Sequence, residues 1–175
     1  MPKIIPNVRE DILTKSALIL AKKGYKGFTA REIAKECNIA VGTLYNYFDG
    51  TDMIMAELML NDWNVTMTSV EKEAEKQTDF VNGLLSMCDV VREFVVKYEP
   101  IWSQYRNQEK ASSYIGKYGS LVREQMSQRV ILLIEKTNEE RLKPLCAVLV
   151  EIMLSCILQD HLTKEHLKLL LQFLV

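Results

Sequence analysis

The sequence predicts an all-α protein of about nine helices. Of its 175 residues, 48% are hydrophobic and only seven are glycine and four are proline, a composition that favours long helices over a turn-rich β fold. Apolar residues recur at spacings of three and four along most of the chain, which places them on one helix face. Capping residues stand where several of these periodic segments begin. A chain of this length can bury the core of one domain or of two small ones.

The first predicted helix spans residues 8–23. Gly24 follows it and can take the left-handed conformation that ends many helices, and the two lysines before Gly24 suit the negative end of the helix dipole. The apolar positions define a stripe that we expect to be buried, consisting of Ile12, Leu13, Ala17, Leu20 and Ala21.

The stretch from Phe28 to Asp52 predicts two short helices joined by a tight turn. Thr29 and Glu32 have the spacing of a capping box, in which each side chain bonds the other residue's backbone N–H. The turn is expected at Asn38, because asparagine tolerates the left-handed conformation better than most residues do.

The second short helix is predicted over residues 41–48. Leu44 and Phe48 are four residues apart and therefore face inward together. The opposite side is small and polar and is flanked by tyrosines, so it could approach the major groove of DNA closely while the hydroxyls bond phosphate. The outward residues are Gly42, Thr43 and Asn46, and the flanking tyrosines are Tyr45 and Tyr47, which could also pack against neighbouring helices.

The remaining helices are predicted from the same periodicity. Pro100 is expected to end one of them, since proline disfavours a helical conformation in the residue before it. A loop is expected around Ser112 and Ser113, and Thr163 should cap the last helix. The predicted spans are 52–76, 80–98, 101–110, 114 or 120 to 141, 144–160 and 164 to the chain end.

The last two predicted helices are apolar on more than one face. Between Leu145 and Leu158 the only strongly polar residues are Glu151 and Ser155. Such a helix is either central in its own core or shared with a partner subunit. Because two adjacent helices share this character, we favour a symmetric dimer that pairs them as a four-helix bundle. The candidate interface residues are Leu149, Ile152, Met153, Cys156, Leu167, Leu170 and Leu171.

The segment F-T-A-R-E-I-A-K-E-C-N-I-A-V-G-T-L-Y-N-Y-F resembles the DNA-binding segment of the TetR family of bacterial transcriptional regulators. The resemblance covers the first third of the chain and depends mainly on G-T-L-Y-x-Y-F preceded by T-x-x-x-I-A. It implies a three-helix helix-turn-helix DNA-binding domain over 1–51 and a helical ligand-binding and dimerisation domain over 52–175. The positions that match DNA-contacting ones are Thr29, Val41, Gly42, Thr43, Tyr45, Asn46, Tyr47 and Thr51.

Three positions depart from the family pattern. Asn38 stands where the family often has glycine, which is a physically acceptable exchange. Ala40 stands where serine is common and so removes a helix cap, and Thr51 stands where lysine is common and so removes a charge. The last two departures predict weaker and less salt-dependent DNA binding, or contacts supplied elsewhere.

The resemblance also implies a cavity for a small-molecule effector, which the sequence does not identify, and no cofactor. An effector that prefers one arrangement of the dimer would change the separation of the two DNA-reading heads and weaken operator binding. Aromatic and methionine side chains could line the cavity, although at helical spacing such residues belong to an ordinary core more often than to a pocket. The candidates are Trp63, Met87, Trp102, Tyr105 and Met126.

No enzyme or metal site is expected. His161 and His166 are five residues apart, a poor spacing for two ligands on one helix face, and the nucleophile-elbow, zinc-protease and phosphate-loop motifs are absent. The four cysteines form no C-x-x-C pair, which favours buried thiols in a reducing compartment over a disulfide framework. They are Cys37, Cys88, Cys146 and Cys156.

The charge distribution favours a DNA-binding amino-terminal part. Residues 1–51 hold eight Lys/Arg and five Asp/Glu, whereas residues 52–175 hold fourteen and eighteen. The sequence has neither a long uncharged apolar run nor a signal-peptide core, so we expect a cytoplasmic protein with no membrane partner.

Together these features predict a ligand-responsive DNA-binding transcriptional regulator. The resemblance implies a repressor that binds a palindromic operator in double-stranded DNA as a homodimer. The alternative is a helical protein–protein interaction module without DNA affinity, which Ala40, Thr51 and the net charge of −1 support.

Overall fold

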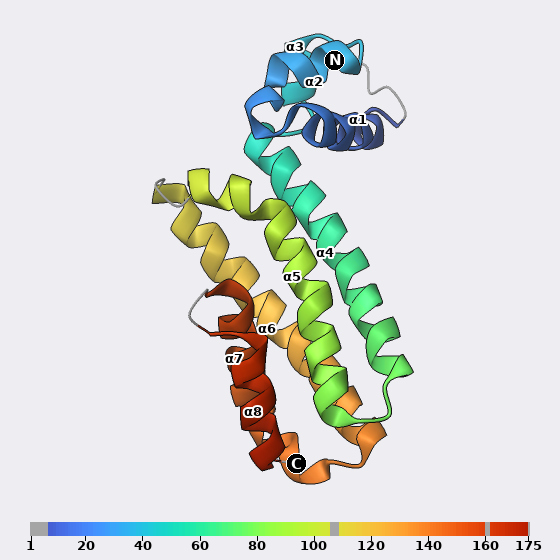
Figure 1. Cartoon of the computed structure of the whole chain (residues 1–175). Helices are drawn as coiled ribbons and strands as arrows, with labels where there is room; N and C mark the ends of the chain where they lie inside the picture. The colour runs from blue at the N-terminus through green and yellow to red at the C-terminus, as the bar shows by residue number, and fades with distance from the viewer. Residues whose placement is uncertain (1–6, 106–108, 160–161, 175) are drawn as a thin grey trace. The chain divides into compact units, whose positions relative to one another are not determined.

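A computed structural model describes residues 7–105, 109–159 and 162–174, with backbone alone for 102–105 and 109–118. Within these ranges every regular element is helical, as predicted (Figure 1). The α-helices are α1 (Val8–Lys23), α2 (Ala30–Glu36), α3 (Val41–Tyr45), α4 (Thr51–Lys76), α5 (Phe80–Tyr105), α6 (Glu109–Thr137), α7 (Cys146–Leu158) and α8 (Lys164–Leu174). Two short 3₁₀ segments, η1 (Tyr25–Gly27) and η2 (Glu140–Leu145), precede α2 and α7.

The chain forms two compact units, the first ending at Asp62 and the second beginning at Trp63. The helix α4 contributes its first turns to the first unit and the rest to the second. The predicted boundary between residues 51 and 52 separates two expected functions, DNA binding and effector binding, and not two packing units. It stays a prediction.

In the first unit, α1 has the predicted bounds and ends as predicted. Gly24 has a φ of +63°, and its N–H donates to the Leu20 carbonyl over 3.0 Å. The predicted buried stripe is wrong at Ala17 and Ala21, which are exposed. The residues that α1 buries completely or nearly so are Ile12, Ser16 and Ile19.

Ser16 explains this error. Its hydroxyl lies in the interior, fully buried and without a hydrogen-bond partner, so a polar residue occupies a core position. A prediction based on apolar residues alone leaves Ser16 out of the buried stripe and assigns Ala17 to it instead.

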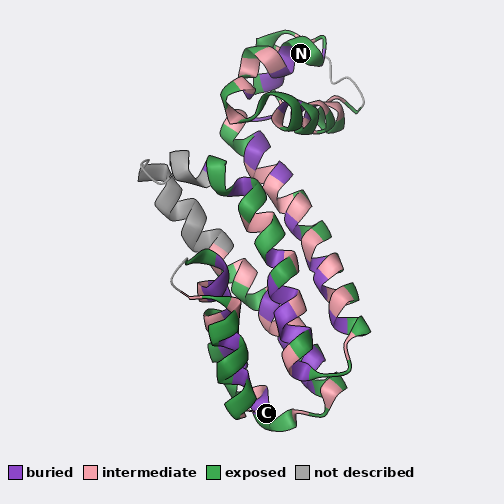
Figure 2. Cartoon of the chain, in the orientation of Figure 1, coloured by how far each residue is buried: buried purple, intermediate pink, exposed green. Residues whose placement is uncertain are grey.

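The core of the second unit lies between α5, α6, α7 and α8, with apolar residues of α4 added to it. Figure 2 shows buried residues along the facing sides of these helices. The helices α5 and α6 approach closely at Gly83, where an added Cβ would lie 2.6 Å from Cδ1 of Leu133. A larger residue at position 83 would therefore force the buried Leu133 side chain to move.

Two predicted helix breaks are absent. The helix α5 continues through Pro100, and α6 already includes Ser112 and Ser113, which were predicted to form a loop. Proline 100 cannot donate to the carbonyl of Val96, but both residues are exposed, so water can reach that carbonyl. The eight described α-helices are therefore fewer than the nine expected.

The helix ends after α5 also differ from the prediction. The helix α6 stops at Thr137 rather than Arg141, because Asn138 takes a left-handed φ of +60°. Pro144 lies in η2, so α7 begins two residues later than predicted. At Thr163, the backbone N–H donates to Nδ1 of His166 over 3.1 Å, so histidine provides the bond that glutamate usually makes to the cap residue of a capping box.

All four cysteines are buried free thiols, as predicted. Burial raises the pKa of each thiol, and it raises the pKa of Cys88 to about 12. Since the thiolate is the reactive form, roughly one Cys88 thiol in ten thousand would be ionised at pH 8.

We therefore expect the native chain to resist iodoacetamide at pH 8, and all four thiols to react once urea unfolds it. Mass spectrometry after a short pulse of reagent would measure the number of alkylated cysteines. Rapid alkylation of Cys88 in the native protein would contradict its burial.

None of the described helices is both long and apolar enough to cross a lipid bilayer.

Candidate nucleic-acid interface

The helix α2 starts at the predicted cap. Thr29 has extended backbone dihedrals, and its Oγ1 accepts the N–H of Glu32 over 3.2 Å. The second bond of the capping box, from the Thr29 N–H to the Glu32 carboxylate, is not the one that forms. The Glu32 carboxylate instead pairs with Lys23 at the end of α1. The hydrogen bond from Lys23 lowers the pKa of the Glu32 carboxyl, and the same bond raises the pKa of the Lys23 ammonium.

The turn after α2 is built as predicted. Asn38 has a φ of +54°, and its N–H donates to the Lys35 carbonyl over 3.1 Å. The next N–H, of Ile39, donates to the Ala34 carbonyl over 2.9 Å. This paired arrangement satisfies the last carbonyls of α2 and redirects the chain into α3.

The helix α3 is shorter than predicted, ending at Tyr45 instead of Phe48. The N–H groups of Tyr47 and Phe48 both donate to the Leu44 carbonyl, at 3.0 and 3.1 Å, so the chain continues as a tight turn. Leu44 and Phe48 are both buried, as predicted.

The outward side of α3 is open. An added Cβ at Gly42 would meet no atom within 4 Å, and Tyr45 keeps 51% of its surface exposed. Val41 and Asn46 are also exposed, while Thr43 and Tyr47 are half-buried. Of the other two predicted contact residues, Thr29 is exposed and Thr51 is half-buried. None of the eight predicted DNA-binding residues is sealed in the core.

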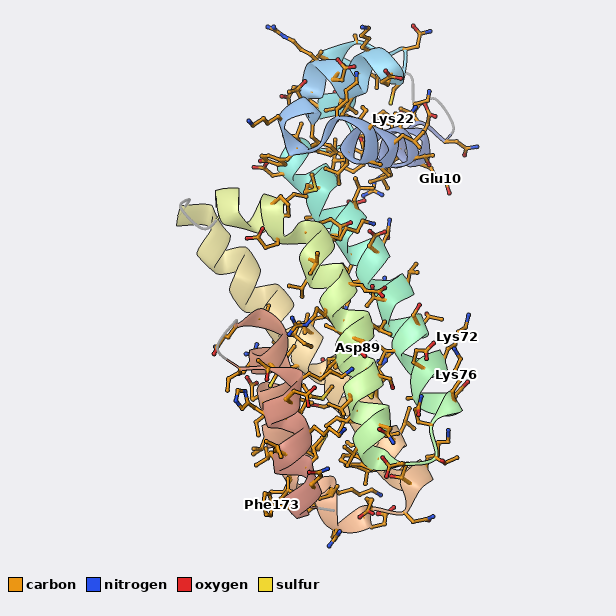
Figure 3. All side chains as sticks on the ribbon, in the orientation of Figure 1. Glu10, Lys22, Lys72, Lys76, Asp89 and Phe173 are labelled. Carbon is orange, nitrogen blue, oxygen red and sulfur yellow. The ribbon has the colours of Figure 1, made fainter. Side chains whose placement is uncertain are left out.

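Exposed basic side chains lie on α2 and in the segment immediately before it. Arg31 and Lys35 lie on α2, and Lys22 and Lys26 lie at the end of α1 and in η1. Figure 3 shows Lys22 on α1. These four residues were not among the predicted contacts, although the positive charge of residues 1–51 indicated them as a group.

Ala40 is the residue that caps α3, and it forms no side-chain hydrogen bond there. Its φ of −69° and ψ of 148° are those of a cap that serine could occupy without change. We expect Ala40→Ser to stabilise the first unit by about 1 kcal/mol and to raise DNA affinity modestly, because serine adds a cap and a phosphate donor.

Urea unfolding and a DNA titration would measure the two effects of Ala40→Ser. Ala40→Val is the matched control, since valine adds bulk without a cap. Equal unfolding midpoints for the serine and valine variants would contradict the assignment of Ala40 as the capping position.

The comparison with protein families decides the identity of this helix pair. The profile described as "Bacterial regulatory proteins, tetR family" matches residues 12–58. Residues 12–58 therefore form a TetR-family helix-turn-helix segment. The matched segment begins in α1 and ends in α4, so it contains the whole α2–turn–α3 arrangement.

The curated relatives of this chain are described as HTH-type transcriptional regulators. An uncharacterised HTH-type transcriptional regulator of Haemophilus influenzae is 22% identical over 108 residues, which is 62% of this chain and 58% of that protein. The regulator YuxN of Bacillus subtilis is 32% identical over 63 residues, 35% of this chain and 22% of YuxN. The match thus spans less than two thirds of the length of either relative.

Solved structures share the fold over nearly the whole chain. Thermus thermophilus FadR, described as a TetR-family repressor in complex with lauroyl-CoA, has a TM-score of 0.62 at 16% identity and covers 95% of this chain and 92% of that one. A TetR-family regulator from Syntrophomonas wolfei has a TM-score of 0.57 at 20% identity, covering 96% and 93%. At these identities the likeness shows the fold alone.

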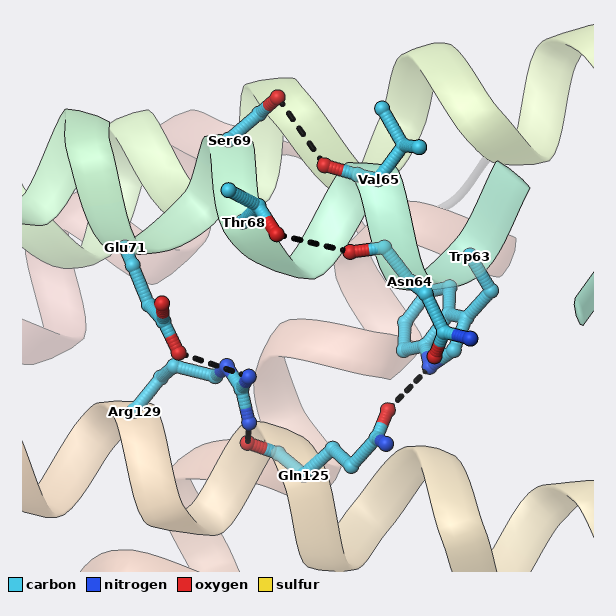
Figure 4. A network of polar contacts seen from close by, with 8 residues as sticks. All are labelled: Trp63, Asn64, Val65, Thr68, Ser69, Glu71, Gln125 and Arg129. Carbon is cyan, nitrogen blue, oxygen red and sulfur yellow. Dashed lines mark hydrogen bonds and ion pairs between the residues drawn. The ribbon is translucent and has the colours of Figure 1, made fainter. Parts of the chain in front are cut away.

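Three predicted effector-lining residues, Trp63, Met87 and Met126, are buried in the core of the second unit. The indole N–H of Trp63 donates to Oε1 of Gln125 over 2.5 Å, within a polar network between α4 and α6 (Figure 4). Arg129 continues this network to the Glu71 carboxylate at 2.7 Å. The side chains of Trp102 and Tyr105 lie outside the described residues.

The second unit carries an open groove of about 580 Å³ between α7 and α8. Of the effector candidates whose side chains are described, Trp63, Met87 and Met126, none lines this groove. Its lining is mostly apolar and consists of Ala147, Val148, Glu151, Ile152, Ser155, Cys156, Leu162, His166, Leu167 and Leu170.

Five of the seven predicted interface residues are buried in the chain's own core, namely Leu149, Met153, Cys156, Leu167 and Leu171. Ile152 is half-buried, and Leu170 is exposed. Other apolar residues of the same two helices lie exposed, and Figure 3 shows one of them, Phe173, which is 91% exposed. The exposed set that sequence reasoning missed is Val148, Leu158, Leu169 and Phe173.

Proposed function

We propose that the chain is a transcriptional repressor that binds a palindromic operator in duplex DNA as a homodimer. The observation that carries the proposal is the open, small-residue side of α3, held outward by the burial of Leu44 and Phe48. A helix with such a side can approach base edges in a major groove while neighbouring hydroxyls bond phosphate. Residues 1–51 would form the DNA-binding domain and 52–175 the effector and dimerisation domain.

Eight residues are proposed to contact DNA. Those nearest the bases would lie on α3, and the tyrosine hydroxyls and the cap of α2 would contact phosphate. They are Thr29, Val41, Gly42, Thr43, Tyr45, Asn46, Tyr47 and Thr51. Because Ala40 provides no cap and residue 51 carries no charge, fewer phosphate contacts and a shallower salt dependence are expected.

The homodimer would form through the outer faces of α7 and α8. Both helices bury one side in their own core and still expose large apolar side chains, including Val148, Leu169 and Phe173. Exposed apolar patches of this kind mark association surfaces in soluble proteins. A two-fold axis would pair these faces and place two DNA-reading heads on one operator.

A small molecule bound in the second unit would control the repressor. Related folds support this, since the neighbouring structures include a FadR complex with lauroyl-CoA and a regulator complex with choline. A cytoplasmic location is part of the same proposal, since operators lie there.

Selection from random duplexes at two salt concentrations tests the proposal. A repeatedly enriched palindrome whose affinity falls with salt would support a dimeric operator-binding protein. No enrichment by a normally folded chain would overturn it and favour a helical interaction module without DNA affinity. Sedimentation of the same sample would show whether the binding species is a dimer.

A further inference from the structure

One side chain near the start of α1 links three parts of the first unit. The guanidinium carbon of Arg9 lies 4.9 Å from the centre of the Phe48 ring. The same guanidinium forms an ion pair with Glu57 in the second turn of α4. Arg9 therefore bridges α1, the turn that follows α3 and the beginning of α4.

Phe48 is the residue that fixes the end of the DNA-facing segment. Its ring is 1% exposed, and its N–H donates to the Leu44 carbonyl over 3.1 Å. The three residues immediately before it, Tyr45, Asn46 and Tyr47, are proposed DNA contacts. A cation over the face of an aromatic ring is attracted to it, so Arg9 holds this ring from the solvent side.

We propose that Arg9 is a positioning residue for DNA binding, which acts by holding residues 45–47 through Phe48 and Glu57. The proposal rests on the proposed function of α3. Arg9 need not touch DNA in this role, since its guanidinium is already engaged by the ring and the carboxylate. Nothing in the residue pattern of the sequence distinguishes it from the other basic residues of the first unit.

The first unit contains a matched control pair. The side chains of Arg9 and Glu57 are 50% and 23% exposed, and those of Lys23 and Glu32 are 47% and 24% exposed. Both pairs join α1 to a later helix, but Lys23 and Glu32 join it to α2 and not to the segment after α3. The carboxylates of Glu57 and Glu32 therefore connect α1 to different helices, although their exposed fractions are nearly equal.

The decisive variants are Glu57→Gln and Glu32→Gln. Each removes one negative charge, which by long-range electrostatics alone should leave DNA affinity unchanged or raise it. If Arg9 positions the DNA-facing segment, Glu57→Gln instead lowers affinity by about fivefold, while Glu32→Gln does not lower it. Equal or higher affinity for Glu57→Gln than for the parent chain would overturn the proposal.

Amide hydrogen exchange gives a readout that needs no DNA. Arg9→Met should speed exchange of the Phe48 amide by about tenfold, through local opening, and leave the Ile33 amide in α2 unchanged. Arg9→Lys, which keeps the ion pair, should restore most of the protection. Unchanged exchange at Phe48 in Arg9→Met would overturn the proposal even if DNA binding is found. If the parent chain selects no DNA, the proposed function fails, and this exchange experiment still decides whether Arg9 holds the segment.

Discussion

Gly42→Asp should lower the affinity for the selected operator by at least about a hundredfold, because a carboxylate at the proposed contact surface would face phosphates and base edges. The free protein offers no obstacle to the substitution, since an added Cβ at this position meets nothing within 4 Å. Aspartate in the first turn of a helix also suits the positive end of its dipole. We therefore expect the variant to be at least as stable as the parent chain.

A fluorescence-anisotropy titration of labelled operator would measure this loss. Gly42→Asn is the matched control, because it has nearly the same size without the charge, and it should lose less affinity. Urea unfolding of both variants would show that the first unit is intact. Parent-like operator affinity in a folded Gly42→Asp variant would remove Gly42 from the interface.

Phe48→Ala should destabilise the first unit by about 3–5 kcal/mol, as deletion of a fully buried aromatic ring usually does. The ring is 1% exposed and packs in a unit that ends at Asp62, so the unit has little additional core to compensate. We expect melting followed by circular dichroism to show an early transition that the parent chain lacks. The later transition should be nearly unchanged, since the core of the second unit contains no residue before Trp63.

Tyr45→Ala is the control for Phe48→Ala. It also deletes an aromatic ring from the same segment, but this ring is 51% exposed. Its unfolding free energy should stay within about 0.5 kcal/mol of the parent value. Equal destabilisation by the two substitutions would contradict the assigned orientation of α3.

Local chemistry explains why the first unit could be predicted from the sequence. The cap at Thr29, the left-handed turn at Asn38 and the glycine stop at Gly24 each depend on residues within a few positions of one another. Each feature could therefore be predicted without knowledge of the tertiary fold. The side of α3 that faces outward followed from the spacing of two apolar residues.

Features that depend on long-range packing could not be predicted in the same way. Proline 100 was expected to end a helix, but its exposed position lets α5 continue through it. In α7, nearly every residue is apolar, so the sequence could not show which side its own core would take. The predicted interface residues fell mainly on that inner side, and the exposed apolar residues lie beside them.

The ion pair of Arg9 with Glu57 shows the same limit within the first unit. These residues are far apart in the sequence, and arginine and glutamate are both common at exposed helix positions. Only their juxtaposition around Phe48 gives them a role.

Hydrogen exchange with and without the selected operator would test the central claim most directly. If the open side of α3 enters the duplex, peptides covering residues 41–47 gain the strongest protection, and the start of α2 at Thr29 gains some. Peptides from α6 should change far less. Protection centred on α7 and α8, with residues 41–47 exchanging as in the free protein, would contradict the account.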